Sequence, residues 1–259
     1  MKILFIGDIM GSPGRRAADG MLAGLRSKYD CRMAIVNAEN AAGGLGLSEP
    51  CAKSLFAAGA DVLTMGNHTF AKRSVGSYLD DEIRIVRPAN YPPGVPGRGW
   101  GIYQTLGGES VAVVNLLGRV FMDAVDCPFR AADSVLDEIV DHTKIIVVDM
   151  HAEATSEKVA MGRYLEGRVS AVIGTHTHVQ TSDEKVLPGG TAYITDAGMT
   201  GVEYSVIGMD YSTVIGRFLT HVPGKFQLAE GTASINGVVV DIDTQTGRAV
   251  SIQRVTETE

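Results

Sequence analysis

The sequence lacks the features that define several large classes of protein. It contains no run of eighteen apolar residues, which argues against a membrane-spanning helix. Residues 1–6 lead directly into a strand pattern without a signal-peptide cleavage region, so we expect a cytoplasmic protein. No internal repeat, low-complexity stretch or linker is evident, and residues 1–259 are therefore predicted to form a single domain.

Cysteine and positive charge are also scarce. Cys31, Cys51 and Cys127 are an odd number without the spacing of a metal site, which indicates reduced, structural thiols. The net charge of −7 disfavours a general nucleic-acid-binding surface, because such surfaces carry an excess of lysine and arginine. A small phosphorylated substrate is compatible with this charge if the site carries positive charge of its own.

Neither of the familiar glycine-rich nucleotide motifs is present. Residues 7–11, Gly-Asp-Ile-Met-Gly, lack the glycine spacing of the dinucleotide fingerprint. The loop 37–46, Asn-Ala-Glu-Asn-Ala-Ala-Gly-Gly-Leu-Gly, has no Gly-Lys-Ser/Thr ending, so a Walker-type phosphate loop is disfavoured. Its glycines either let the backbone approach a ligand closely or provide a flexible connection.

The sequence does contain short β-branched runs that alternate with helical patterns, which is typical of an α/β fold with helices flanking one mixed sheet or two packed sheets. Helices are predicted at residues 15–29, 48–58, 129–142 and 155–165, with Ser48 and Thr155 as caps and 155–158 as solvated first turns. The remaining C-terminal segments are expected to be strand and turn. Strands are predicted at residues 2–6, 33–36, 61–65, 102–106, 111–116, 144–149, 169–173, 191–195, 233–243 and 249–255, the fourth and fifth as an antiparallel hairpin.

Polar side chains follow the predicted strands at the points where the strands end. Asp8 taken alone favours a turn or helix-capping role, and His176 and His178 taken alone are as easily two unrelated loop histidines. In an extended segment, however, residues two apart point the same way, so both imidazoles can face one point. Open α/β sheets hold their ligand sites at such strand ends. The full set is Asp8, Glu39, Asn40, Asn67, His68, His151, His176 and His178.

A set of this composition suits two metal ions. Carboxylate, amide and imidazole groups can together hold two ions about 3.5–4 Å apart, as in two-metal hydrolases. Asn67 and His68 are neighbours that face different ways, which suits one ligand and one acid or base better than two ligands of one ion. His142 and His221 lack this placement and are interpreted as ordinary surface or loop histidines.

Four blocks of sequence are distinctive: 37–40, Asn-Ala-Glu-Asn; 66–69, Gly-Asn-His-Thr; 151–158, His-Ala-Glu-Ala-Thr-Ser-Glu-Lys; and 174–181, Gly-Thr-His-Thr-His-Val-Gln-Thr. These blocks resemble the YmdB-like bacterial branch of the calcineurin-like metallophosphoesterases. The wider superfamily has Asp-x-His where this chain has Asp8-Ile9-Met10, and Gly-Asp-x-x-Asp where it has residues 37–40. Both departures are features of the YmdB-like branch.

The resemblance implies a calcineurin-like sandwich, with central β-sheets flanked by helices and metal loops at the carboxyl ends of the strands. It implies two divalent ions, iron or manganese, with zinc also compatible. Two such ions and the carboxylates of Asp8 and Glu39 leave about +2 on the cluster, which supplies the positive charge that a phosphate needs. The implied ligands are Asp8, Glu39, Asn40 and His178 for one ion, and Glu39, Asn67, His151 and His176 for the other.

The resemblance further implies a phosphodiesterase for small nucleotides, with 2′,3′-cyclic nucleotides as the favoured substrates. A metal-bridging hydroxide would attack phosphorus, and His68, free of metal, would protonate the leaving alkoxide. The alternatives are a phosphomonoesterase, or a metal- or nucleotide-binding signalling protein without relevant turnover. A homo-oligomer is left open, and no membrane partner is expected. Residues 43–44, Asn90 and residues 198–201 are candidate walls of the site, with a structural role equally compatible.

Overall fold

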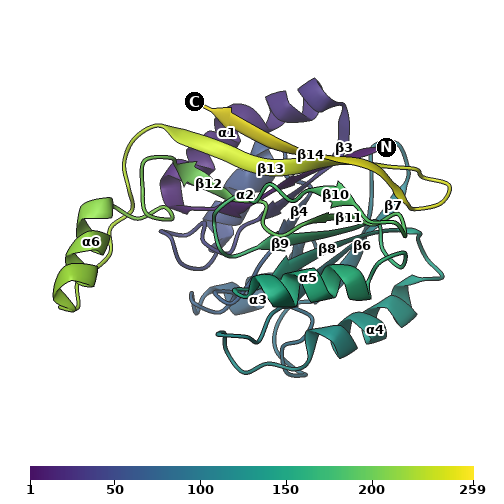
Figure 1. Ribbon diagram of the computed structural model, residues 1–259, viewed down its shortest axis with the longest axis horizontal. Coiled ribbons are helices and arrows are strands. Elements are labelled where there is room, and N and C mark those ends of the chain that lie inside the picture. Colours follow the sequence, from purple (N-terminus) through teal and green to yellow (C-terminus); the bar gives the residue numbers. More distant parts are fainter.

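Two mixed β-sheets form the centre of the computed structural model, which describes residues 1–259 (Figure 1). The first sheet runs in the order β2 (Asp8–Ile9), β12 (Met199–Val202), β13 (Ala233–Ile242), β1 (Lys2–Ile6), β3 (Cys31–Asn37), β4 (Val62–Thr64) and β5 (Ile85–Val86), and β14 (Ala249–Thr258) pairs with β13. The second sheet runs in the order β10 (Lys185–Val186), β11 (Ala192–Ile194), β9 (Ala171–Thr175), β8 (Ile145–His151), β7 (Ser110–Leu117) and β6 (Trp100–Gln104).

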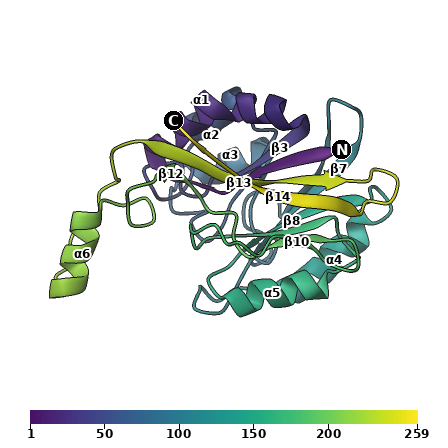
Figure 2. The ribbon, with the colours of Figure 1, turned by 45° about the horizontal axis from the view of Figure 1, so that its top comes forward.

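Helices cover the outer face of each sheet, so the molecule has four layers (Figures 1 and 2). The first sheet is covered by α1 (Gly11–Tyr29), α2 (Glu49–Ala58) and α3 (Val75–Asp81). The second is covered by α4 (Pro128–Ile139) and α5 (Thr155–Tyr164), while α6 (Tyr211–Thr220) extends away from the layers. None of these helices combines the length and apolar character that a membrane crossing requires.

The core follows from the alternation of side chains along the strands. In β1, Ile3 and Phe5 face the second sheet, whereas Leu4 and Ile6 face the helices. This period of two is the expected geometry of a strand buried on both faces. The predicted α/β fold with flanking helices is thus confirmed, in its two-sheet form.

Parallel pairing gathers the carboxyl ends of the central strands at one edge. β1, β3 and β4 are parallel in the first sheet, and β7, β8 and β9 are parallel in the second. β6 and β7 form the predicted antiparallel hairpin. The loops that follow β1, β3, β4, β8 and β9 therefore meet where the two sheets adjoin.

One prediction for the helices is wrong, and a second is wrong in part. The C-terminal third contains α6, whose apolar residues recur at helical spacing within a segment that we expected to be strand and turn. The first turns of α5 are solvated only in part, because Thr155 and Ser156 are exposed whereas Glu157 and Lys158 are buried. Glu157 accepts hydrogen bonds from the backbone N–H groups of Arg119 and Val120, which lets its carboxylate leave the solvent.

The predicted caps also differ in detail. Thr155 is the first residue of α5, and Ala154 occupies the cap position. Ser48 precedes α2 as predicted, but its side chain makes no capping hydrogen bond. The short helix α3 lies in a segment that the sequence indicated only as polar and turn-rich; Val75 and Leu79, four residues apart, bury its inner face.

Candidate metal centre

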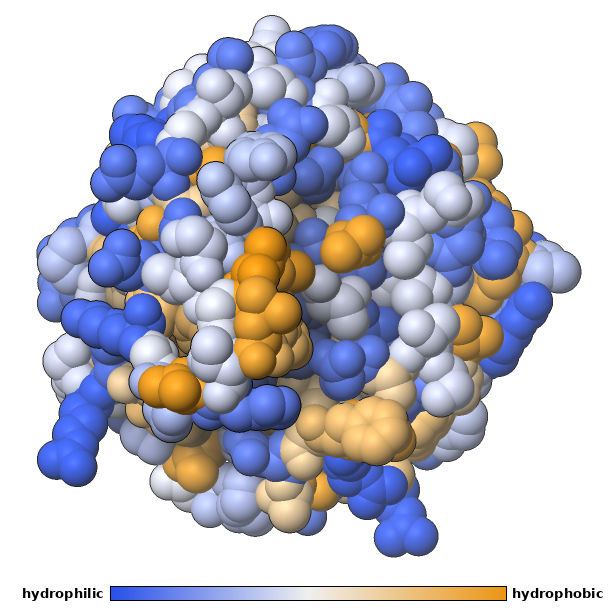
Figure 3. Space-filling model, turned by 60° about the vertical axis from the view of Figure 1, so that its left-hand side comes forward, coloured by the Kyte–Doolittle hydropathy of each residue, from blue (hydrophilic) through white to orange (hydrophobic).

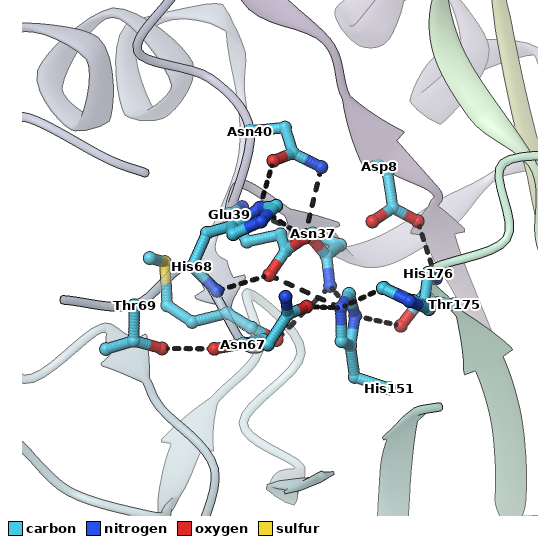
Figure 4. A network of polar contacts seen from close by, with 12 residues as sticks. Asp8, Asn37, Glu39, Asn40, Asn67, His68, Thr69, His151, Thr175 and His176 are labelled. Atoms are coloured by element: carbon cyan, nitrogen blue, oxygen red, sulfur yellow. Dashed lines mark hydrogen bonds and ion pairs between the residues drawn. The ribbon is translucent and has the colours of Figure 1, made fainter. Parts of the chain in front are cut away.

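The side chains singled out at strand ends lie together at the shared edge of the two sheets. Figure 4 shows Asp8, Asn40, Asn67, His68 and His176 around Glu39 and His151. The first sheet supplies the residues that follow or continue β1, β3 and β4, and the second supplies those at the ends of β8 and β9. The former are Asp8, Glu39, Asn40, Asn67 and His68, and the latter are His151, His176 and His178.

One group of side chains surrounds Nε2 of His151. This nitrogen lies 3.1 Å from Oδ1 of Asn67, 3.1 Å from Nδ1 of His176 and 3.3 Å from Oε2 of Glu39. Glu39, His151 and His176 place one ligand atom each within 4.8 Å of one another. All four atoms are of the kind that coordinates a divalent cation.

A second group adjoins the first through Glu39. Nδ2 of Asn40 lies 3.1 Å from Oε1 of Glu39 and 3.2 Å from Nε2 of His178. Nε2 of His178 lies 3.8 Å from Oδ1 of Asp8. Glu39 therefore directs one carboxylate oxygen to each group, which is the placement that a bridging ligand requires.

Each imidazole of the two groups has its other nitrogen tied to an outer acceptor. Nδ1 of His151 lies 2.8 Å from Oγ1 of Thr175, whose hydroxyl donates to the buried Asp149. Nε2 of His176 lies 3.2 Å from a carboxylate oxygen of Glu153. Such outer partners hold a metal-binding histidine in the tautomer whose inner nitrogen has a free lone pair.

His178 follows the same rule with a backbone partner. Its Nδ1 lies 3.0 Å from the carbonyl oxygen of Ile207. The ring therefore donates outwards and presents Nε2 to Asp8 and Asn40. All three imidazoles of the centre are thus held for ligation from outside it.

The donor set fits divalent cations. Oδ1 of Asp8 is buried and has no hydrogen-bond partner, and buried polar atoms of this kind require an explanation such as an ion. Four carboxylates at this edge have 0% exposure, whereas Lys158 is the one buried lysine. An excess of buried negative charge is stabilised by cations. The four are Asp8, Glu39, Asp149 and Asp196.

The pKa values reflect the same excess. Burial opposes ionisation of Glu39, but His151 and His68 outweigh it and hold the pKa of Glu39 well below its usual range. Burial acts against the charged form of His151, yet Glu39 raises its pKa to about 9. The Glu39 carboxylate thus attracts a cation, here the proton of His151. Burial and the neighbouring His151 lower the pKa of His176 to about 3, which keeps that imidazole neutral and able to coordinate.

The loop that carries His176 and His178 is not extended, contrary to our expectation. Both residues have positive φ angles, 96° and 68°, so the left-handed backbone rather than a strand period directs their rings. Thr177, between them, donates from its N–H and hydroxyl to Asp196 at 3.0 and 2.7 Å. Lys158 pairs with the same oxygen at 2.8 Å. This buried pair holds the loop in its unfavourable conformation.

His68 contacts the second group through Asn40 and Glu39. Its ring nitrogen Nδ1 is 2.7 Å from Oδ1 of Asn40 and 3.2 Å from Oε1 of Glu39. The backbone N–H of His68 donates to Oε2 of Glu39. The side chain remains about one-third exposed at 32%. That the imidazole of His68 stays free of metal is a prediction.

A cleft of about 330 Å³ opens directly above the centre. Of the candidate walls, Gly44 lines the cleft, whereas residues 198–201 do not. Asn90 is buried elsewhere, where it donates to the carbonyls of Leu117 and Asp126, so its role is structural. The volume is that of a small-molecule site. Its lining is Met10, Glu39, Asn40, Gly44, His68, Glu153, His176, Thr177, His178, Ile207 and Met209.

Sequence reasoning missed the residues that support the ligands. Asp149 could have been found, because a carboxylate in the otherwise apolar strand β8 needs partners. Asp196 and Lys158 carry a weaker signal, since each looks like an ordinary polar loop or helix residue. Ile207 acts through its backbone oxygen, which no sequence pattern identifies.

Two packed mixed sheets with a cluster of carboxylate, amide and imidazole groups at their shared edge define the α/β metallophosphoesterase class. The chain belongs to the YmdB-like family, whose model, described as "YmdB-like protein", matches residues 4–255. Family membership agrees with the resemblance seen in the four sequence blocks.

Three known proteins illustrate the relationship. A Bacillus subtilis protein named 2′,3′-cyclic-nucleotide 2′-phosphodiesterase is 51% identical, over 98% of this chain and 96% of its own. The crystal structure of a hypothetical protein from Thermus thermophilus has a TM-score of 0.93 at 44% identity, with both chains covered completely. The crystal structure of a novel phosphatase from Mycoplasma pneumoniae has a TM-score of 0.92 at 33% identity, covering 100% of this chain and 94% of that one. The fold and family predictions are confirmed.

Proposed function

We propose that this chain is a metal-dependent phosphodiesterase that hydrolyses 2′,3′-cyclic nucleotides. The observation that carries the proposal is the pair of adjoining ligand groups joined by Glu39, at the base of a cleft sized for a small molecule. The name of the Bacillus subtilis relative, which is 51% identical over nearly the whole chain, supports this substrate class.

The proposed centre holds two divalent ions. The contacts support one site made by Asp8, Glu39, Asn40 and His178, and a second made by Glu39, Asn67, His151 and His176. Oxygen and imidazole ligands suit iron or manganese and are also compatible with zinc. With two carboxylates in the set, the loaded centre keeps about +2, which attracts a phosphate into an otherwise acidic protein.

The ions would lower the pKa of a water nucleophile and neutralise charge that develops on the phosphoryl oxygens. The chain itself supplies the remaining chemistry. His68 lies on the wall of the cleft and is proposed to donate a proton to the departing ribose oxygen. The burial of Asp8 and Glu39 keeps bulk water from the base of the cleft, where electrostatic interactions are correspondingly stronger.

The proposal is tested by hydrolysis of 2′,3′-cyclic AMP by manganese-loaded protein, with metal content measured on the same samples. Wild type should turn the substrate over. Asp8→Ala should lose most of its metal at one site and at least ~10²-fold in turnover, because a carboxylate ligand is removed. Asp19→Ala, at an exposed position of α1, is the matched control and should behave as wild type.

Two outcomes would redirect the proposal. Turnover of phosphomonoesters but not of the cyclic diester would assign the centre to a phosphomonoesterase. No turnover of either by protein that holds both metals would indicate a binding protein instead.

A further inference from the structure

The cleft above the metal centre has no basic side chain in its lining. It contains neither lysine nor arginine, and the one buried lysine, Lys158, is paired with Asp196 and does not line the cleft. Two apolar lining residues, Met10 and Met209, adjoin one another beside Gly44. Figure 3 shows hydrophobic side chains gathered beside a hollow on the face at which the parallel strands end. The proposed metal ions therefore supply the permanent positive charge that a bound phosphate meets.

Glu153 adds a negative charge to the wall of the cleft. It is the one carboxylate of the lining besides the proposed ligand Glu39. Glu39 is fully buried among the ligands, whereas the side chain of Glu153 is 50% exposed. Oε2 of Glu153 lies 3.2 Å from Nε2 of His176. Glu153 is therefore the carboxylate that an anion meets on entering the cleft.

The position of Glu153 is fixed by the short turn that carries it. Residues 152–154 connect the end of β8 with the start of α5. Ala152 is fully buried, and the backbone N–H of Glu153 donates to Sδ of Met122 at 3.3 Å. The carboxylate thus belongs to a built wall of the cleft and is held beside His176 from two elements of the fold.

The charge of Glu153 has a direct consequence for a bound phosphate. The loaded centre keeps about +2, and the carboxylate of Glu153 lowers the charge around the cleft to about +1. A phosphodiester carries one negative charge, whereas a phosphomonoester carries nearly two at neutral pH. The site therefore matches the diester. The second charge of a monoester meets repulsion, with no lysine or arginine in the cleft to neutralise it.

We propose that Glu153 determines the specificity of the site for phosphodiesters by repelling ligands that carry a second negative charge. This inference rests on the proposed phosphodiesterase function and adds the residue that selects the class of ester. It also concerns the product. Hydrolysis adds water across one P–O bond of the cyclic diester, and the monoester that results carries the additional charge. The carboxylate that admits the substrate therefore favours release of the product.

Glu153 also contacts His176, and the two roles can be separated by substitution. The amide of Glu153→Gln keeps an oxygen that accepts from Nε2 of His176, but it removes the charge. Glu153→Asp keeps the charge but shortens the side chain by one methylene group, which weakens the contact. If Glu153 only oriented His176, the Gln variant would select ligands as wild type does. If its charge selects, the Asp variant keeps the selectivity and the Gln variant loses it.

The test is isothermal titration calorimetry of manganese-loaded protein, freed of excess metal, with inorganic phosphate and with dimethyl phosphate at about pH 8, where phosphate carries two charges. Glu153→Gln should bind phosphate roughly 10-fold more tightly than wild type and dimethyl phosphate roughly 3-fold more tightly, because repulsion scales with the charge of the ligand and is screened at a half-exposed group. Glu153→Asp should keep the wild-type ratio of the two affinities. Glu138→Gln, at an exposed position of α4, is the matched control and should bind both anions as wild type does.

Steady-state kinetics at equal metal content provide a second measurement. The Gln variant should gain roughly 3-fold in kcat/KM for p-nitrophenyl phosphate relative to bis(p-nitrophenyl) phosphate. Equal gains in affinity for the two anions, or no gain for phosphate, would overturn the role of Glu153. Calorimetry requires no turnover. A wild type that binds both anions but hydrolyses no diester would therefore remove the proposed function, while the affinities of the variants would still decide the role of Glu153.

Discussion

The side-chain amide of Asn40 lies between two histidines, and its orientation affects both. As it stands, Oδ1 faces His68 and Nδ2 faces Glu39 and His178. A metal ligand must be the amide oxygen, so coordination requires the amide to turn by about 180°. A general acid must be the protonated imidazolium, whose Nδ1–H needs an acceptor, and Oε1 of Glu39 at 3.2 Å provides one when the amide has turned. One rotation would thus affect both a proposed metal ligand and the proposed acid.

The acid role of His68 predicts a dependence on the leaving group. His68→Ala should reduce hydrolysis of 2′,3′-cyclic AMP by roughly 10²–10⁴-fold, the usual contribution of a general acid. Hydrolysis of bis(p-nitrophenyl) phosphate should fall much less, because an aryl oxide leaves without a proton. Steady-state kinetics on both esters at equal metal content measure the difference. His142→Ala, at an exposed histidine, is the control, and equal losses on the two esters would remove the acid role.

The convergence of eight side chains could be predicted from the sequence because each lies at the end of a recognisable strand, and strand ends meet by topology. The directions in which the rings of His176 and His178 point could not be predicted, since they depend on a left-handed backbone at both residues. That backbone is held by Asp196, which lies 19 residues beyond Thr177 in the chain, and such contacts leave no local pattern.

At the scale of elements, α5 supports the loop that carries His176 and His178 through a buried ion pair. Lys158 of α5 and Asp196 have 1% and 0% side-chain exposure, and Asp196 also binds Thr177 and the N–H of Gly198. Buried charges are stable only when they are paired and hydrogen-bonded. α5 is thereby coupled to the loop between β9 and β10.

Removing one member of this pair should be costly. Lys158→Met should reduce the free energy of unfolding by ~3–5 kcal/mol, because the carboxylate of Asp196 stays buried without its partner. Urea denaturation measures the change. Lys53→Met, in an exposed pair with Glu49, should leave stability almost unchanged. Recovery of stability and of manganese affinity in Lys158→Met combined with Asp196→Asn would identify the charge as the cause; an undiminished stability of Lys158→Met would contradict it.

Elements with strong periodicity were predictable, and elements stabilised by distant contacts were less so. β1, β3 and β8 were identified because β-branched runs between turn residues are a local signal. The helical spacing in α6 was equally local, but few of its apolar residues are buried, and the surrounding turns concealed it. The charged start of α5 indicated solvent exposure. Its burial was missed because the partners of the two charges, Asp196 and the loop at Arg119, are remote in sequence.

At the scale of the whole molecule, the two sheets share one core. Phe5 of β1 and Val238 of β13 belong to the same buried cluster as Val147 of β8 and Ile173 of β9. The proposed metal ligands also come from both sheets, so each ion would connect them. We propose on these grounds that residues 1–259 behave as a single domain.

This arrangement predicts cooperative unfolding that depends on metal. The metal-free chain should unfold in one calorimetric transition, and manganese at about 100 times its dissociation constant should add about 2.7 kcal/mol of stability for each site that it fills. His151→Ala should show a much smaller increase, because it removes a ligand from the second sheet. Two separate transitions in the metal-free chain would show that the sheets are independent units.

The pairing of β1 with β13 has a consequence for synthesis of the protein. Lys2 pairs with Asp241, so β1 acquires this neighbour only after the long segment between them has left the ribosome. Until then one edge of β1 is open, and open edges of apolar strands invite association between chains. Nascent or truncated chains that end before β13 should therefore depend on chaperones, whereas a chain that includes β13 closes the edge with its own strand.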